Sequence, residues 1–188
     1  MAEGRVLEIN TYVAMLRGIN VSGQKIIKMD RLKSIFESMQ LQEVTTYIQS
    51  GNVIFGTTES DKVVLRDRIE STLKEALGYD VPVVIRSNDE LDEVIKLNPF
   101  AVAELPEGEK VYVTFLASQP TTEAIAHFEM YSNDVDDFRV LSREVYILSR
   151  KGYGKSLFSN NFVEKKLKVT ATTRNWETVN KLADLSRR

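Results

Sequence analysis

Ten residues of this sequence are candidates for a site that binds an anion. Guanidinium and ammonium groups pair with phosphate or carboxylate, and amide and hydroxyl groups add oriented hydrogen bonds. Six of the ten lie in the first third of the chain, and four lie near its end. They are Arg17, Asn20, Lys25, Gln49, Ser50 and Asn52, followed by Lys155, Thr173, Arg174 and Asn175.

The segment from Glu43 to Gly56 predicts a β-hairpin that presents part of this chemistry. Two β-type runs flank Ser50-Gly51, a pair suited to a two-residue turn. In that register Gln49 lies opposite Asn52 and Ile48 lies opposite Val53, so two amides lie together at the tip. The residues leave open whether these amides bind a ligand or only satisfy the turn.

The elements before and after the hairpin predict how it is positioned. The expected order is a strand over Asn10–Leu16, a glycine-punctuated loop over 17–25, a helix over 29–39, the hairpin, a helix over 65–77 that ends at Gly78, and a strand over Pro82–Arg86. This β-α-β-β-α-β order is that of a ferredoxin-like fold. In that fold the first two strands run parallel with the third between them. Arg17, Asn20 and Lys25 should therefore lie at the same end of the sheet as the hairpin tip.

A second series of elements follows. A capping box at Ser87–Glu90 opens a short helix that Pro99 ends, and residues 104–109 form a polar linker. Strands over 111–116, 135–141 and 144–149, a helix over 121–130, and helices over 161–167 and 174–185 are expected. The predicted fold is therefore α+β with two ferredoxin-like halves. Residues 10–98 form the first half, 99–110 the linker, and 111–188 a degenerate βαββ half with two C-terminal helices.

The predicted helix over residues 174–185 determines the electrostatic environment that we expect for Arg174. Thr173 is a good N-cap, and Trp176, Val179 and Leu182 give the helix an apolar stripe that predicts a core position for Trp176. Arg174 then falls in the first turn, where the helix macrodipole disfavours a cation. A bound anion would remove this penalty, and a carboxylate from the acidic middle of the chain would do the same.

Other catalytic and metal-binding chemistry finds little support. The sequence has no cysteine, which excludes disulfides and thiolate chemistry, and its only histidine, His127, lies on a predicted helix. Asp134, Asp136 and Asp137 lack the spacing of a calcium loop. Residues 149–156 resemble a phosphate loop, but Ser149 stands where the Walker pattern requires glycine. We therefore expect no cofactor and no metal, and a glycine-containing basic loop around Lys155.

The charge distribution is uneven along the chain. Residues 57–137 carry 7 Lys/Arg and 18 Asp/Glu, whereas residues 138–188 carry 12 and 4, within a total net charge of −2. A basic end on an acidic body indicates an anionic partner, an intramolecular clamp or a solvated basic face. No apolar run is long enough to span a membrane, and Met1–Arg5 does not resemble a signal peptide. These features predict a cytoplasmic protein of bacterial style that has no membrane partner.

Three segments together resemble a known family. Residues 12–23, 46–53 and 171–179 are similar to the bacterial family known as domain of unknown function 1697, and the likeness spans roughly residues 10 to 185. Ser22 stands where a second glycine of the loop is expected. The resemblance implies an α+β protein built from ferredoxin-like halves, and it implies no activity.

The sequence therefore favours binding of a phosphate-bearing ligand, a nucleotide or nucleic acid, at a polar and net-basic site. We expect the first loop, the hairpin tip and the start of the last helix to form this site, with one anion held jointly by Arg174 and the Arg17–Lys25 loop. One alternative is an enzyme that acts on a small anionic metabolite, with Arg17, Lys25 and Arg174 stabilising charge. Another is a protein-interaction module whose basic C-terminal region docks an acidic protein. The sequence contains no signal for an oligomeric state.

Overall fold

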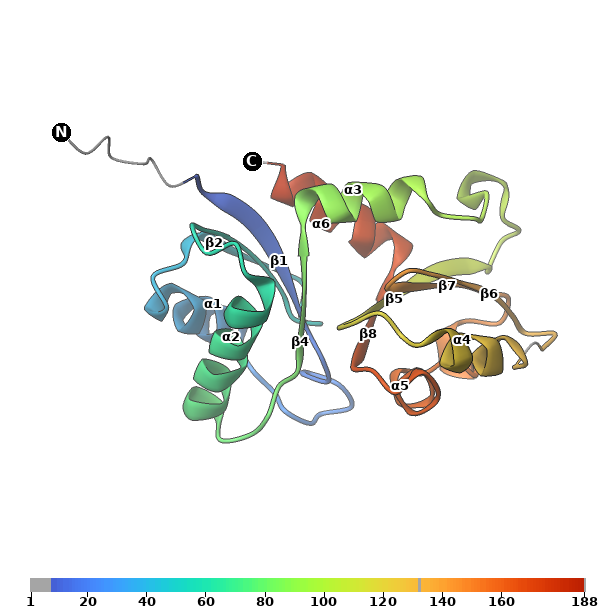
Figure 1. Ribbon diagram of the computed structural model, residues 1–188, viewed down its shortest axis with the longest axis horizontal. Coiled ribbons are helices and arrows are strands. Elements are labelled where there is room, and N and C mark those ends of the chain that lie inside the picture. The colour runs from blue at the N-terminus through green and yellow to red at the C-terminus, as the bar shows by residue number, and fades with distance from the viewer. Residues whose placement is uncertain (1–7, 132, 188) are drawn as a thin grey trace. The chain divides into compact units, whose positions relative to one another are not determined.

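The structure is a computed structural model that describes residues 8–131 and 133–187 (Figure 1). Residues 1–7, which include the segment Met1–Arg5 considered above, lie outside the described residues. The chain forms two compact units. The first contains the described residues through Asn88 and those from Asp184 onward, and the second contains Asp89–Ala183.

The first unit contains a four-stranded sheet with two helices on one face (Figure 1). In space its strands follow the order β2-β3-β1-β4, and every neighbouring pair is antiparallel, so β1 and β2 run parallel with β3 between them. This is the predicted ferredoxin-like arrangement. Its elements are β1 (Asn10–Leu16), α1 (Met29–Ser38), β2 (Gln42–Tyr47), β3 (Asn52–Thr57), α2 (Lys62–Leu77) and β4 (Val83–Ser87).

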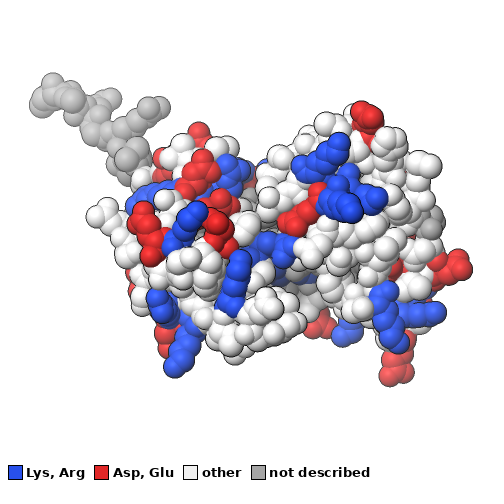
Figure 2. All heavy atoms as spheres, turned by 90° about the horizontal axis from the view of Figure 1, so that it is seen from below, with Lys and Arg blue, Asp and Glu red and all other residues white. Residues whose placement is uncertain are grey.

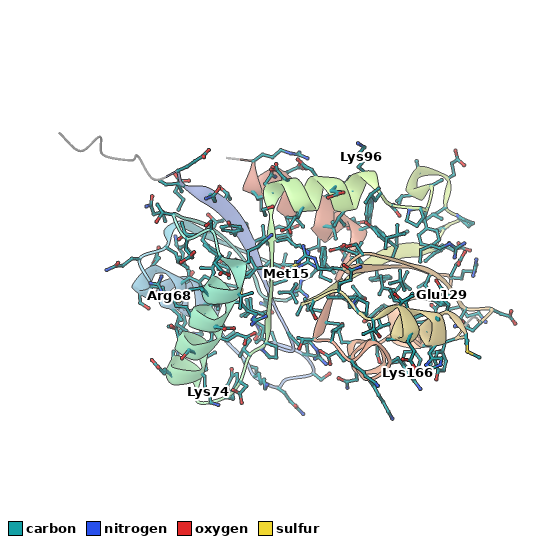
Figure 3. The ribbon with its side chains drawn as sticks, viewed as in Figure 1. Met15, Arg68, Lys74, Lys96, Glu129 and Lys166 are labelled. Atoms are coloured by element: carbon teal, nitrogen blue, oxygen red, sulfur yellow. The ribbon has the colours of Figure 1, made fainter. Side chains whose placement is uncertain are left out.

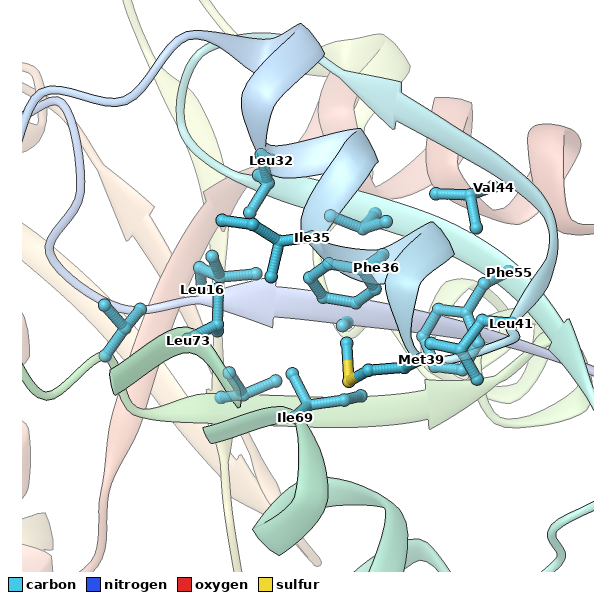
Figure 4. Close-up of a cluster of buried hydrophobic side chains, with 14 of the residues drawn as sticks. Leu16, Leu32, Ile35, Phe36, Met39, Leu41, Val44, Phe55, Ile69 and Leu73 are labelled. Carbon is cyan, nitrogen blue, oxygen red and sulfur yellow. The ribbon is translucent and has the colours of Figure 1, made fainter. Parts of the chain in front are cut away.

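The core of the first unit lies between the sheet and these helices, as Figure 4 shows. Side chains alternate along a strand, so every second residue of β1 and β3 faces the helices. Gly78 ends α2 in a left-handed conformation with φ 80, which confirms the predicted stop. The helices contribute residues at the spacing that predicted them, namely Leu32, Ile35 and Phe36 from α1 and Leu65, Ile69 and Leu73 from α2.

The hairpin between β2 and β3 differs from its prediction in turn length and register. Tyr47, rather than Gln49, lies opposite Asn52. The turn therefore contains the four residues Ile48–Gly51, and Ile48 has a left-handed backbone with φ 50. A β-branched residue rarely adopts that conformation, which is why the sequence pattern favoured continuing the strand through Ile48.

The second unit repeats the topology of the first. Its strands follow the order β6-β7-β5-β8, again with every neighbouring pair antiparallel. The structural duplication expected from the order of elements is therefore present. Its elements are α3 (Asn88–Lys96), η1 (Val102–Glu104), β5 (Lys110–Leu116), α4 (Thr122–Glu129), β6 (Asp136–Leu141), β7 (Glu144–Ser149), η2 (Tyr153–Lys155), α5 (Asn160–Leu167), β8 (Ala171–Asn175) and α6 (Trp176–Ser186). Asn88 of α3 and residues 184–186 of α6 are counted in the first unit.

Strand β8 is the element that the sequence analysis missed. We expected Thr173 to cap a helix that contains Arg174, but Ala171–Asn175 pairs with β5 along its whole length. The helix α6 begins at Trp176, directly after the strand ends. Asn175 Oδ1 accepts a hydrogen bond from the backbone N–H of Thr178 at 2.8 Å. Asn175 therefore caps α6. The strand is short and directly precedes an apolar helical stripe, so the helical period masked it.

Helices cover both faces of the second sheet. On one face, Phe128 of α4 and Val163 of α5 pack against Val145 and Ile147 of β7. Tyr146 lies between those two β7 residues and points to the other face, where its hydroxyl donates to the carbonyl of Val94 in α3 at 2.9 Å. Figure 3 shows Glu129 on α4 and Lys166 on α5. Among the described residues, no helix has the length and apolar character needed to cross a bilayer.

Candidate functional site

The loop between β1 and α1 and the tip of the β2–β3 hairpin lie at one end of the first sheet. The backbone N–H of Leu16 donates to the carbonyl of Gly51 at 2.8 Å, and Asn20 Nδ2 donates to the carbonyl of Gln49 at 2.8 Å. The prediction that Arg17, Asn20 and the hairpin tip share one end of the sheet is therefore confirmed. Parallel β1 and β2 place their carboxyl ends together, which is the physical reason for this proximity.

Asn20 holds this end of the unit together. Its Oδ1 accepts a hydrogen bond from the backbone N–H of Ile27 at 2.8 Å, and its Nδ2 donates to the Ile27 carbonyl at 3.1 Å and to the Gln49 carbonyl. Both amide hydrogens are thus used within the protein. Asn20 shapes the candidate site instead of offering its amide to a ligand.

The loop itself has a compact and unusual backbone. Gly18, Asn20, Ser22, Gly23 and Lys25 all have positive φ angles. The backbone N–H of Gln24 donates to the carbonyl of Val21 at 2.9 Å, with Ser22 and Gly23 between them, so residues 21–24 form a type I′ turn. Residues 21–26 are exposed. Non-glycine residues with positive φ concentrate at functional sites, and three of them, Asn20, Ser22 and Lys25, lie in this loop.

Lys25 is held at the edge of this loop. Its Nζ donates to the carbonyl of Asp80 at 2.9 Å and lies 5.1 Å from the centre of the Tyr79 ring. The Asp80 carboxylate pairs instead with Lys74, at the end of α2, at 2.9 Å (Figure 3 labels Lys74). An ammonium has three N–H bonds, and one is given to Asp80. The positive charge of Lys25 therefore has a fixed position and further donors for an anion.

The amides of the hairpin tip do not form the pair that we expected. Asn52 is fully buried, and its Nδ2 donates to the carbonyl of Tyr47 at 2.9 Å and to Ser50 Oγ at 3.1 Å. Asn52 is therefore a structural residue of the four-residue turn. Gln49 and Ser50 are exposed on the turn, and they remain candidate contacts at the end of the sheet.

In the second unit, Thr173 belongs to a partly buried hydrogen-bond network of side chains. Its Oγ1 lies 2.7 Å from Thr114 Oγ1, donates to Asn160 Oδ1 at 2.7 Å and accepts from the Tyr153 hydroxyl at 3.2 Å. The ring of Tyr153 also packs on Tyr112, with 4.9 Å between the ring centres. Tyr153 was not among the predicted site residues, although an aromatic residue between two glycines was a visible signal that this basic loop is anchored.

Arg174 lies on the face of β8 opposite to Thr173, because side chains alternate along a strand. It is buried, and its Nη1 donates to Thr172 Oγ1 and to the Thr173 carbonyl, both at 2.8 Å. Burial lowers the pKa of Arg174 to about 10, and the nearby Tyr153 opposes this effect. The expected penalty from a helix macrodipole does not apply, because Arg174 lies within a strand.

The four C-terminal candidates therefore do not form one surface in the second unit. Thr173 is committed to the hydroxyl network, Arg174 is buried on the other face of the strand, and Asn175 caps α6. Lys155 is exposed in η2. The idea that Arg174 and the 17–25 loop hold one anion together involves both units and stays a prediction.

A buried arginine in the first unit was also missed. Arg86 of β4 is 1% exposed and lies opposite Val13 of β1, just as Arg174 of β8 lies opposite Val113 of β5. Arg86 Nη1 donates to the carbonyl of Ile85 at 3.0 Å. The sequence pattern that could have indicated this buried arginine is a cation that directly follows the apolar strand residues Val83–Ile85. The two matching arginines show that the duplication extends to single positions.

The side of the molecule shown in Figure 2 does not display the charge asymmetry of the sequence as one continuous basic face. On the side shown in Figure 2, Lys and Arg side chains form several separate groups, and Asp and Glu side chains lie beside most of them. Adjacent opposite charges reduce the long-range field. Local groups of residues, and not the net charge of the C-terminal region, are therefore the relevant candidates on this side.

Comparison with known proteins gives the family. A family model described as "Protein of unknown function (DUF1697)" matches residues 9–146. The chain belongs to this family. The match to DUF1697 includes the 12–23 and 46–53 segments, whereas the 171–179 segment lies beyond it.

A solved structure supports the fold of this DUF1697 chain. The conserved bacterial protein SP0830 from Streptococcus pneumoniae is similar with a TM-score of 0.76 and 17% sequence identity, over 96% of this chain and 100% of that one. At this identity the likeness shows the fold alone. No curated protein matches the chain.

Proposed function

We propose that the first unit binds a phosphate-bearing ligand, a nucleotide or nucleic acid, at the end of its sheet. The site consists of the 17–28 loop and the 48–51 turn. These two segments contain Arg17, Lys25 and Lys28 and no Asp or Glu. Three cations within two short segments that meet at one end of the sheet favour an anionic ligand.

The observation that carries the proposal is the Asn20 brace. Its bonds to Ile27 and Gln49 fix the loop against the turn before any ligand arrives. A preorganised loop loses little conformational entropy on binding.

Exposed apolar side chains at the same end favour a nucleotide over inorganic phosphate. Val21 is 58% exposed, Ile26 is 72% exposed and Ile48 is 45% exposed. Grouped exposed apolar side chains are typical of binding surfaces. A nucleoside could cover them while its phosphate contacts the cations. The absence of cysteine is in keeping with a cytoplasmic location for such binding.

A thermal-shift and calorimetric titration tests this proposal. The probes are inorganic phosphate, adenosine monophosphate and a twelve-nucleotide oligothymidylate, each at low salt. Adenosine monophosphate or the oligonucleotide should stabilise the protein, and Lys25→Ala should weaken that binding about tenfold, as expected for one charge-assisted contact. If the oligonucleotide binds, log K should fall with log salt by about 0.7 for each phosphate neutralised.

Lys62→Ala is the charge-matched control. Lys62 begins α2, after the end of β3 that lies away from the hairpin turn, so this variant should bind like the wild type. The proposal is wrong if none of the three probes binds at low salt. It is also wrong if Lys62→Ala and Lys25→Ala weaken binding equally.

A further inference from the structure

A cleft in the second unit has a chemistry opposite to that of the proposed anion site. Its volume is about 280 Å³, and it is lined by residues of the 102–112 segment and by residues 175–177. These two parts of the chain meet because β5 and β8 pair with Tyr112 opposite Asn175. The segment that the sequence predicted as a polar linker is therefore one wall of a cleft large enough for a small molecule or one side chain.

Aromatic side chains form part of this cleft. Trp176, which we expected in the core, is only partly buried and lines the cleft together with Tyr112. The ring of Tyr112 is held by its contact with Tyr153. The faces of tryptophan and tyrosine rings carry negative electrostatic potential and attract ammonium and guanidinium groups.

Carboxylates give the cleft a net negative charge. Glu107, Glu109 and Glu177 line it, and Lys110 is the one cation among its lining residues. In the described part of the chain, none of these four side chains forms an ion pair with another residue. No three His, Cys, Asp or Glu of the described residues are arranged to hold a metal ion. The chemistry of the walls therefore suits an organic cation better than a metal.

We propose that this cleft binds an alkylammonium ligand. The ammonium would lie against the Trp176 ring and be neutralised by Glu109 and Glu177, with the alkyl chain along the apolar residues of the 102–106 segment. Such a group occurs in free polyamines and in lysine side chains. This assignment concerns the second unit alone and does not depend on anion binding by the first.

The sole tryptophan of the chain provides the test, because Trp176 reports on its own surroundings. The full chain is titrated with spermidine and with Nα-acetyl-lysine methylamide while tryptophan emission is recorded. Spermidine should give a saturable change, and affinity should fall as salt rises, since the contact is electrostatic. Saturation by both probes supports recognition of alkylammonium in general, whereas saturation by spermidine alone supports a free polyamine.

Substitutions assign the effect to the cleft. Glu109→Gln and Glu177→Gln keep the size of each side chain, and each should weaken spermidine binding about tenfold. Glu129→Gln is the matched control, because Glu129 is exposed on α4, outside the cleft (Figure 3). The proposal is overturned if spermidine causes no saturable change. Equal weakening in Glu129→Gln and the cleft variants would also overturn it, because binding would then reflect net charge.

Discussion

Asn20 and Gln49 are 29 positions apart in sequence and are joined by a hydrogen bond of 2.8 Å from the Asn20 side chain to the Gln49 carbonyl. The same Asn20 amide closes its own loop through two bonds to Ile27. One side chain therefore fixes the relative positions of two segments at the end of the first sheet. The stability and the binding behaviour of this end both depend on it.

Replacing Asn20 should cost stability, while replacing Gln49 should not. Asn20→Gly removes all three side-chain bonds and tolerates the local φ of 53, so we expect a loss of roughly 1–3 kcal/mol in the free energy of unfolding. Gln49→Ala retains the carbonyl acceptor and should change the free energy by no more than about 0.5 kcal/mol. Urea denaturation measures both. Equal losses in the two variants would contradict the role assigned to Asn20.

Gly51 should tolerate alanine less well than another glycine with the same backbone conformation. A Cβ at Gly51, where φ is +81, would lie 2.5 Å from Cδ1 of the buried Ile19, whereas a Cβ at Gly78, where φ is +80, meets nothing within 4 Å. Gly78→Ala should therefore cost about 1–2 kcal/mol for the left-handed backbone alone. Gly51→Ala should cost about 1–3 kcal/mol more for overpacking.

A second substitution checks the cause of the Gly51 effect. Ile19→Val removes the Cδ1 atom that the new methyl group would meet. In thermal or urea unfolding, the double variant Gly51→Ala/Ile19→Val should lose less stability than the sum of the two single variants. Strict additivity would show that the contact with Ile19 Cδ1 is not the source of the cost.

Tyr146 should make the protein lose stability at alkaline pH. Burial, and then the charges of Glu144 and Glu93, raise the pKa of Tyr146 well above its ordinary value of 10.0. The unfolded state therefore releases this proton near pH 10 while the folded state keeps it. The stabilisation due to Tyr146 is complete below pH 10 and falls as the pH rises above that value.

Tyr146→Phe isolates this effect. At pH 8 the variant lacks the bond from the hydroxyl to the Val94 carbonyl and should be less stable by roughly 0.5–1.5 kcal/mol. Between pH 9.5 and 11 the difference in stability between the wild type and Tyr146→Phe should shrink. Only the wild type has a proton at this position that the unfolded state releases more readily than the folded state, so only the wild type loses stability for this reason. Urea unfolding at several pH values measures the difference, and a constant value across that range would contradict the raised pKa.

Asp136 should stabilise the folded protein because its carboxylate accepts a hydrogen bond, and not because the carboxylate is charged. It is 3% exposed, its Oδ2 accepts from the backbone N–H of Leu157 at 3.1 Å, and its Oδ1 has no hydrogen-bond partner among the described residues. Asp136→Ala leaves the Leu157 N–H without its acceptor and should cost roughly 1–3 kcal/mol. Asp136→Asn keeps an oxygen acceptor.

Comparing these two Asp136 variants separates the contribution of the hydrogen bond from that of the charge. Asp136→Asn should remain within about 1 kcal/mol of the wild type, because burying an unpaired charge offers no net gain. Thermal unfolding at pH 7 provides the measurement. A loss in Asp136→Asn as large as that in Asp136→Ala would mean that the charge itself stabilises the loop after β7.

Much of the fold followed from local patterns. The helical spacing of Leu65, Ile69 and Leu73 predicted α2, and the order of elements predicted a ferredoxin-like first half. The same order predicted that the 17–25 loop and the hairpin tip lie together. Periodicity reports which side of an element faces a core, and few topologies are compatible with a given order of strands and helices, so these features are readable from one sequence.

The tertiary structure alone decided what the candidate side chains do. The sequence marked Asn20, Asn52 and Thr173 as polar groups available to a ligand, but each forms hydrogen bonds within its own unit. Arg174 was assigned to a helix and lies in a strand, because pairing with β5 outweighed a helical stripe that begins two residues later, at Trp176. The cleft beside Trp176 arises from that same pairing. Hydrogen-bond partners and cleft walls come from segments far apart in the chain, and their meeting depends on strand register, which local sequence patterns do not encode.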